Sequence, residues 1–290
     1  MRLAYNQADM AIFWWADGYL DFNGAQSPRV REAIAGWMQW QRREQLPVLA
    51  RHLQDLQRQV MESTDAAAIC RWQGLGQRAM TDALEVALPA LADVARTLTP
   101  EQLQHLERRY AKGDEEFRAR FTKGDVSERR ARSFKTTVER AEMIYGRLND
   151  AQRQQLRQAM SASPFDAELW FTERVARQRN LMLALQGSVA VPQTAGDRAR
   201  VVELLRGVAE QVERSPRPAY RAYRERLAEY SCSLYAKLHN ATTPAQREHA
   251  RARFKGWEED LRVLAGDAAD ASNQGSGTRN RRGSGAALTL

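Results

Sequence analysis

The stretch LTPEQLQHLERRY at residues 98–110 holds the pattern that decides the fold class. The Thr99 hydroxyl can accept a hydrogen bond from the Gln102 amide, while the Gln102 side chain reaches back to the Thr99 amide, as in a capping box. Pro100 fits the first helical position, because an N–H there would have no partner. Apolar residues three and four apart follow, so we predict a helix from residue 100 onward.

Similar helix-start signals recur along the chain at Thr64, Asp125, Asn149 and Thr243. Between them, apolar residues repeat at helical spacing, and alternating Val, Ile and Thr runs are nearly absent. We therefore predict an all-α protein, a multi-helix bundle of about eight to ten helices. The starts are unequally spaced, which favours independent N-caps over a solenoid and leaves tandem duplication as the alternative.

Proline and glycine suggest where this bundle is interrupted. Ser27 with Pro28 is expected to open a long helix after a turn at residues 21–24, and Pro47 to kink or split it. Pro89 predicts a bend in the next helix. We assign residues 1–265 to a single helical domain, with a sub-boundary at the 187–197 loop. Residues 266–290 are rich in Gly and Ser and are predicted to form a disordered tail.

The chain is basic, with a net charge of +8 and an isoelectric point near 9.8 over 290 residues. Its five lysines and 39 arginines are interleaved with Asp and Glu along every predicted helix. This distribution favours a solvated, ion-paired surface, and no nucleic-acid-binding motif accompanies it. No stretch is long and apolar enough for a transmembrane helix, and residues 1–9 do not resemble a signal peptide.

No arrangement of residues identifies a catalytic or metal site. The four histidines lie far apart, and neither a nucleophile motif nor a phosphate-binding loop is present. The acidic cluster 114–116 is interpreted as a solvated helix face beside arginines. We expect no cofactor and no metal, and a non-enzymatic role is favoured over catalysis.

The expected state of the two cysteines depends on the cellular compartment. In a reducing cytosol Cys70 and Cys232 would be small buried core residues. In an oxidising compartment, an isolated pair would be expected to form a disulfide.

Residues 2–9 (RLAYNQAD) and 14–21 (WWADGYLD) resemble the start of a proteobacterial lipoprotein family whose domain has no known function. Cys70-Arg71-Trp72 and residues 140–152 fit the same family, and the resemblance covers most of residues 2–265. A weaker resemblance links Leu98–Gln102 to the Leu-Thr-x-x-Gln signature of small helical periplasmic stress proteins and chaperones.

The resemblance implies a signal peptide and a lipidated cysteine upstream of the Leu-Ala-Tyr-Asn block, and hence a periplasmic protein anchored to the outer membrane. We interpret Met1 as a start placed too late; if Met1 is the true start, the protein is cytoplasmic. The residues of this block that we single out as an interaction or membrane-proximal surface are Tyr5, Asn6, Asp9, Trp14, Trp15, Asp17 and Tyr19. Three consecutive aromatics at 13–15 cover more than one helix face, which favours their burial in the bundle.

The leading hypothesis is a non-enzymatic binding, scaffold or chaperone-like protein of the envelope, whose partner is an envelope protein or polymer. The alternatives are an enzyme acting on an envelope polymer, which requires converging carboxylates or histidines, and a cytoplasmic nucleic-acid-associated protein, which requires a contiguous arginine face.

Overall fold

The computed structural model describes residues 2–189 and 195–280, without the side chains of residues 195–196 and 267–280. The fold is 86% helical, and no strand occurs in these ranges, so the all-α prediction is confirmed. Ten of its eleven helices have seven or more residues, counting α3, η1 and α4 as one continuous helix.

The elements, in chain order, are α1 (Arg2–Asn6), α2 (Ala8–Leu20), α3 (Gln26–Trp40), the π-helical turn η1 (Gln41–Gln45), α4 (Leu46–Gln59), α5 (Ala66–Ala95), α6 (Pro100–Phe121), α7 (Val126–Tyr145), α8 (Asp150–Ser161), α9 (Ala167–Val189), α10 (Ala195–Glu213), α11 (Pro218–Asn240) and α12 (Pro244–Asn280).

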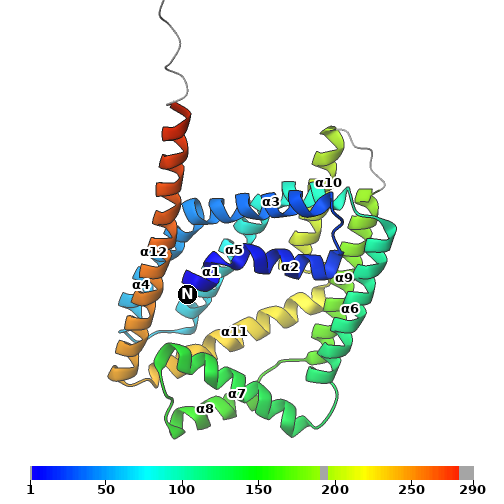
Figure 1. Cartoon of the computed structure of the whole chain (residues 1–290). Coiled ribbons are helices and arrows are strands. Elements are labelled where there is room, and N and C mark those ends of the chain that lie inside the picture. The colour runs from blue at the N-terminus through cyan, green and yellow to red at the C-terminus, as the bar shows by residue number, and fades with distance from the viewer. Residues whose placement is uncertain (1, 190–194, 281–290) are drawn as a thin grey trace, which may run out of the picture.

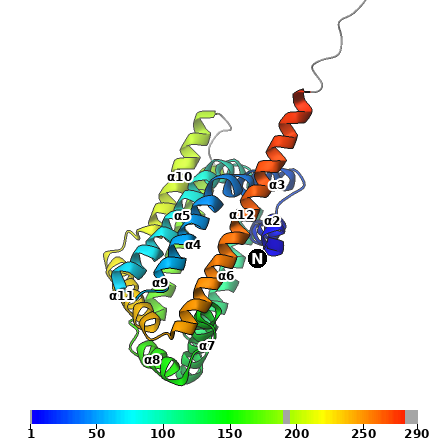
Figure 2. The ribbon, with the colours of Figure 1, turned by 90° about the vertical axis from the view of Figure 1, so that its left-hand side faces the viewer.

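The helices form a frame (Figure 1). Helices α4 and α12 lie along one edge and α6 and α9 along the opposite edge, with α3 at the top and α7 and α8 at the bottom. The short α1 and α2 cross the front of the frame, and Figure 2 shows that they project from one side of the layer made by α4, α5 and α10.

The largest apolar core joins α5, α6, α9 and α10 around Leu88, Leu106 and Val201. Smaller clusters join α7, α8 and α11 around Leu156, and α4 and α12 around Leu264. Because several clusters share the burial, the positions of the helices also depend on polar contacts at the ends of the frame.

One such contact joins the α2–α3 turn to the α5–α6 turn, and we call it the first corner. Thr99 and Gln102 form the predicted capping box at α6. Asn23 and Gln26 form a second box, in which each side chain accepts a hydrogen bond from the other residue's amide at 3.0 Å. The two glutamine side chains pair reciprocally, with Nε2–Oε1 distances of 3.1 and 2.8 Å.

The same glutamines also bind the helix end that faces them. Gln102 Nε2 donates to the carbonyl of Leu20 at 2.8 Å, and Gln26 Nε2 donates to the carbonyl of Thr97 at 2.8 Å. Since the last carbonyls of a helix lack partners within it, each glutamine caps its own helix and satisfies the end of another.

The second corner repeats this arrangement between the α7–α8 turn and the α11–α12 turn, at the opposite corner of the frame (Figure 1). Asn149 with Gln152, and Thr243 with Gln246, form the two boxes. Gln152 Nε2 donates to Gln246 Oε1 at 2.7 Å, and Gln246 Nε2 donates to Gln152 Oε1 at 3.0 Å. The predicted helix starts at Thr99, Asn149 and Thr243 are thus capping boxes that also join distant turns.

Two predicted starts are wrong by one residue or more. Asp65, and not Thr64, caps α5 by accepting from the amide of Ala68. Helix α3 begins at Gln26, ahead of Ser27, because Asn23 and Gln26 already satisfy each other's amides.

The predicted interruption at Pro47 coincides with an irregular helical turn, whereas the helix that contains Pro89 is continuous. Pro47 lies in the first turn of α4, which follows the π-helical turn. A proline ring clashes with the preceding turn of a regular α-helix, so the irregular turn occurs where the sequence predicts an interruption. Pro89 lies inside α5, which nevertheless runs continuously from Ala66 to Ala95. Near the N-terminus, Gln7 separates α1 from α2.

Two boundary predictions fall partly outside the description. Helix α9 ends at Val189 and α10 begins at Ala195, so the central part of the 187–197 loop lies outside the described residues. The backbone of α12 extends to Asn280, and most of the predicted 266–290 tail lacks described side chains. Across the described parts of the chain, no helix combines the length and hydropathy needed to cross a bilayer.

Candidate functional site

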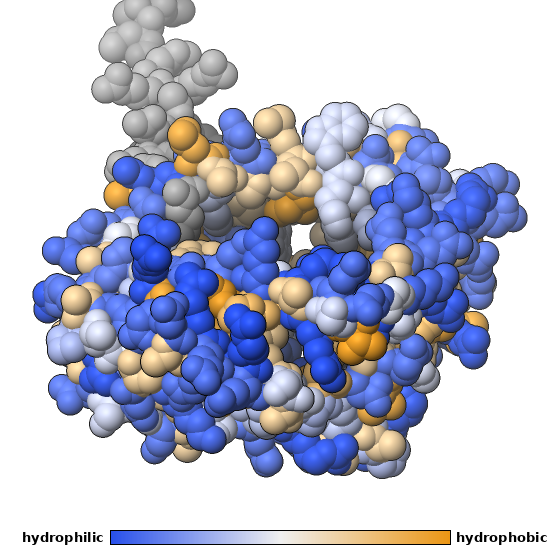
Figure 3. Space-filling view, turned by 90° about the horizontal axis from the view of Figure 1, so that it is seen from below, coloured by the Kyte–Doolittle hydropathy of each residue, from blue (hydrophilic) through white to orange (hydrophobic). Residues whose placement is uncertain are grey.

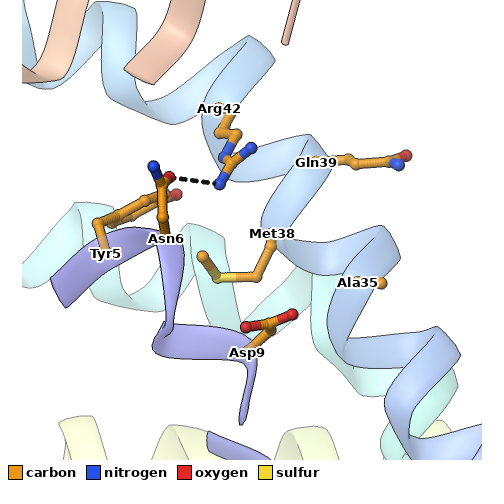
Figure 4. Close-up of a pocket in the computed structure, with 7 residues that line it drawn as sticks. All are labelled: Tyr5, Asn6, Asp9, Ala35, Met38, Gln39 and Arg42. Carbon is orange, nitrogen blue, oxygen red and sulfur yellow. Dashed lines mark hydrogen bonds between the residues drawn. The ribbon is translucent and has the colours of Figure 1, made fainter. Parts of the chain in front are cut away.

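The N-terminal helices α1 and α2 enclose a cavity of about 180 Å³ against α3 and η1. Figure 4 shows its lining, with Asn6 and Arg42 pointing toward one another and Gln39 extending away from them. The residues that line the cavity are Tyr5, Asn6, Asp9, Ala35, Met38, Gln39 and Arg42. The site therefore combines the start of the chain with a turn more than thirty residues later.

Arg42 organises the polar side of this cavity. Its guanidinium donates to Asn6 Oδ1 at 3.0 Å and lies 5.5 Å from the centre of the Tyr5 ring. Its Nε is buried and has no hydrogen-bond partner among the described residues. The Tyr5 hydroxyl donates to Gln41 at 3.3 Å, and burial raises the pKa of Tyr5, with Arg42 opposing that shift. An acceptor group in the cavity would satisfy the free donor.

The cavity offers binding chemistry more than catalytic chemistry. Asp9 is the one carboxylate that lines it, and its Oδ1 accepts from the amide of Met10 at 2.8 Å. A general base and a nucleophile within reach of each other are not found in the described lining. In the described chain, no group of three His, Cys, Asp or Glu residues could hold a metal ion.

The outer face of α1 and α2 is exposed and uncharged. The Met10, Trp14 and Trp15 side chains are 51, 62 and 67% exposed. The exposed positions that follow helical spacing on this face are Leu3, Ala4, Gln7, Met10, Ala11, Trp14, Trp15 and Gly18. We call this set the tryptophan face; it is conspicuous in a chain of which 28% is charged.

The expected burial of the aromatic run is therefore wrong for two of its three members. Phe13 is 3% exposed and packs inward, whereas Trp14 and Trp15 point outward. Arg31 of α3 lies 3.5 Å from the centre of the Phe13 ring and 5.6 Å from that of Trp14. Helix α2 packs against α3 and α6, which bury Phe13 and leave Trp14 and Trp15 in contact with solvent.

The other two residues singled out from the block have structural contacts. Asp17 Oδ1 accepts from the Phe22 amide at 3.0 Å and so supports the turn that leads to the first corner. The Tyr19 ring lies 6.3 Å from that of Tyr110 and 5.3 Å from the Arg109 guanidinium. The structure thus separates the seven residues into a cavity group, an exposed pair and a packing pair.

Sequence reasoning did not find Arg42, Met38 or Gln39 as partners of the N-terminal block. Met38 and Gln39 lie on the last turn of α3, and Arg42 lies in the π-helical turn that follows, so the direction of the Arg42 side chain depends on this irregular turn. Pro47 is the local signal for an irregular turn, but it does not say which side chain the turn reorients.

A disulfide joins Cys70 of α5 to Cys232 of α11, with a Cα–Cα distance of 5.5 Å. Cys232 is fully buried. The pairing that was expected for an oxidising compartment is therefore present in the structure.

Comparison with known proteins gives a family and no activity. A family model described as a family of unknown function, DUF6279, matches residues 18–207. The match begins after the first 17 residues and ends within α10, so it leaves out α1, most of α2, α11 and α12. No curated protein and no solved structure matches the chain. Because the family model covers more than half of its residues, the chain belongs to the DUF6279 family of unknown function.

Proposed function

We propose that this chain is a non-enzymatic scaffold protein of the bacterial envelope, held at the periplasmic side of the outer membrane by an upstream lipid, with its tryptophan face against the bilayer. The observation that carries this proposal is the exposure of Trp14 and Trp15 on a helix face without charge. The resemblance of the N-terminal block to lipoproteins is the reason for proposing a lipid anchor.

The physical chemistry of the face suits a bilayer surface. Indole rings are favoured at the level of the lipid headgroups, and Met10 can insert beside them. Helix α2 has 13 residues, so it is about 20 Å long and can lie in the plane of the interface but cannot span the membrane. The net charge of +8 attracts the chain to anionic headgroups.

The disulfide between Cys70 and Cys232 supports an envelope location. Disulfides persist in oxidising compartments such as the bacterial periplasm, whereas thiols in the cytosol are kept reduced. Most of the surface seen from below is hydrophilic, although it is hollowed by an opening (Figure 3), so we expect the rest of the frame to remain in water.

The binding test compares two methionines on different surfaces. Met10 lies on the tryptophan face and is 51% exposed, whereas Met80 lies on α5 and is 71% exposed. The unmodified protein should co-sediment with vesicles that contain phosphatidylglycerol. Its tryptophan emission should shift to shorter wavelength when these vesicles are added. Met10→Ser and Trp14→Ser should each weaken binding several-fold, and Met80→Ser should not.

Equal binding by all four proteins would overturn the proposal, as would suppression of aggregation of an unfolded chain without any vesicle binding.

The location of the protein is tested separately. The gene expressed with its natural upstream sequence should yield a membrane fraction that incorporates labelled palmitate, and cytoplasmic recovery with two free thiols would contradict the envelope assignment.

A further inference from the structure

A second cavity, of about 400 Å³, lies where α9, the end of α10 and the start of α11 meet. Four arginines and two glutamates line it, so the lining carries a net charge of +2. It is far along the chain from the N-terminal cavity and shares no residue with it. We propose that this cavity binds a phosphate group.

Beside the cavity lies a buried ion-pair cluster around Glu173, which is 2% exposed. This cluster shares Arg177 and Ser215 with the lining of the cavity. Its carboxylate accepts from Arg177 Nε at 2.9 Å, from Arg217 Nε at 2.9 Å and from the Ser215 hydroxyl at 3.2 Å. Arg177 also donates to the carbonyl of Val212 at 2.9 Å. The charge of this carboxylate is therefore paired within the cluster.

Three other arginines of the lining have no carboxylate within ion-pair distance in the described chain: Arg214, Arg221 and Arg224. Arg221 donates to the carbonyl of Ser215 at 2.7 Å, and Arg224 lies 6.0 Å from the Trp170 ring. These contacts orient two guanidinium groups without neutralising them. Arginine forks bind phosphate oxygens in a bidentate manner, which makes phosphate the matching ligand.

The backbone at this place supports the same charge preference. Helix α11 begins here with Pro218 in its first turn, and its N-cap residue, Arg217, makes no side-chain capping hydrogen bond. The positive end of the helix dipole therefore adds to the arginines. The two glutamates of the lining, Glu213 and Glu225, oppose the arginines and leave the net charge at +2.

The test uses two lining arginines and one matched control. Arg214→Gln and Arg224→Gln each remove one charge from the cavity, and Arg226→Gln removes the same charge from an exposed position on α11 outside it. The Arg214 side chain makes no hydrogen bond or ion pair within the described chain and is exposed, so its variant is expected to fold. Binding of inorganic phosphate is measured by calorimetry at fixed ionic strength, and thermal unfolding followed by circular dichroism verifies the fold.

We expect each lining variant to weaken phosphate binding about tenfold, and the control variant to leave it unchanged. A second arm uses phosphatidic acid vesicles in the Met10→Ser background. Binding confined to these vesicles and weakened by the lining variants alone would identify a lipid phosphate as the source. Absence of binding in both arms, or equal weakening by all three variants, would overturn the proposal.

Discussion

The first and second corners join different helices with the same pair of glutamine side chains, but water reaches them to different degrees. Gln26 and Gln102 are 5 and 6% exposed at the first corner. At the second corner Gln152 is 2% exposed, whereas Gln246 is half-buried. The same glutamine pair therefore joins helices at both corners. The free energy that each glutamine contributes should increase with its burial, because an unpaired polar group costs most where water cannot replace the lost partner.

The corners also differ in their surroundings. The second corner contains a buried imidazole: His239 is 4% exposed, its Nε2 lies 2.7 Å from the Glu62 carbonyl and its Nδ1 lies 2.9 Å from the Tyr145 hydroxyl. The first corner relies on amides, hydroxyls and carbonyls alone within its glutamine network. Stability at the second corner should therefore respond to pH.

The largest expected effect comes from breaking the covalent link between the helices that lead into the two corners. Helix α5 leads into the first and α11 into the second, and the Cys70–Cys232 disulfide joins them across 162 residues. The double variant Cys70→Ser and Cys232→Ser should lower the free energy of unfolding by about 3–5 kcal/mol, since the unfolded chain gains freedom. Urea denaturation measures the change.

The control for this experiment is a reductant. The unmodified protein in reductant should match the double variant, and the double variant should not respond to reductant. Identical urea midpoints for oxidised and reduced protein would contradict the predicted contribution.

The glutamines themselves should rank by burial. Gln102→Ala removes the donor to the Leu20 and Asp21 carbonyls and the buried partner of Gln26, and should cost about 2–3 kcal/mol of unfolding free energy. Gln246→Ala removes a half-buried partner and should cost about 1 kcal/mol. Gln104→Ala, at an exposed position on α6, is the control and should change the free energy by less than about 0.5 kcal/mol. Equal costs at the two corners would show that burial does not set the difference.

A change of pH should weaken the second corner. Burial lowers the pKa of His239 below its ordinary value of 6.5, so the folded state binds a proton less readily than the unfolded state. The free energy of unfolding therefore keeps the contribution of neutral His239 above pH 6.5. It loses this contribution as the pH falls below 6.5, by at most about 1.4 kcal/mol per pH unit. Burial also raises the pKa of Tyr145 to about 12, so its hydroxyl remains a donor throughout this range.

Unfolding free energies between pH 5 and 8 test this. His239→Gln should be less stable at pH 7.5 but should lose less stability on acidification than the unmodified protein. A steeper loss in the variant would show that the acid sensitivity lies elsewhere.

These corners also show where local sequence suffices. The boxes at Thr99, Asn149 and Thr243 were predictable, because each needs only residues within one helical turn. The Asn23–Gln26 box was missed, since Asn23-Gly24 is typical of a turn and Ser27-Pro28 provides a stronger start signal. The pairing of glutamines 76 and 94 residues apart depends on helix packing, and no local pattern reports it.

The candidate site shows the same division. Tyr5, Asn6 and Asp9 of the N-terminal block line one cavity, and the interaction surface assigned to this block stays a prediction. Its exposed pair was expected to be buried, because a run of three aromatics usually indicates a helix covered on several sides. How many neighbours cover α2 is set by the frame, and sequence periodicity contains no information about that number.

The last comparison concerns the residue that follows the helix before each corner. Helix α2 is followed by Asp21 with φ 48° and ψ 65°, whereas α7 is followed by Gly146 with φ 73° and ψ −166°. Asp21→Gly should raise the free energy of unfolding by up to about 1 kcal/mol, because glycine adopts this left-handed conformation without a steric cost. Gly146→Ala should instead lower it by about 1–3 kcal/mol, since a side chain is strained at that backbone geometry. Calorimetric melting of both variants gives the two signs together, and a destabilising Asp21→Gly would mean that the Asp21 side chain, rather than its backbone, matters for the first corner.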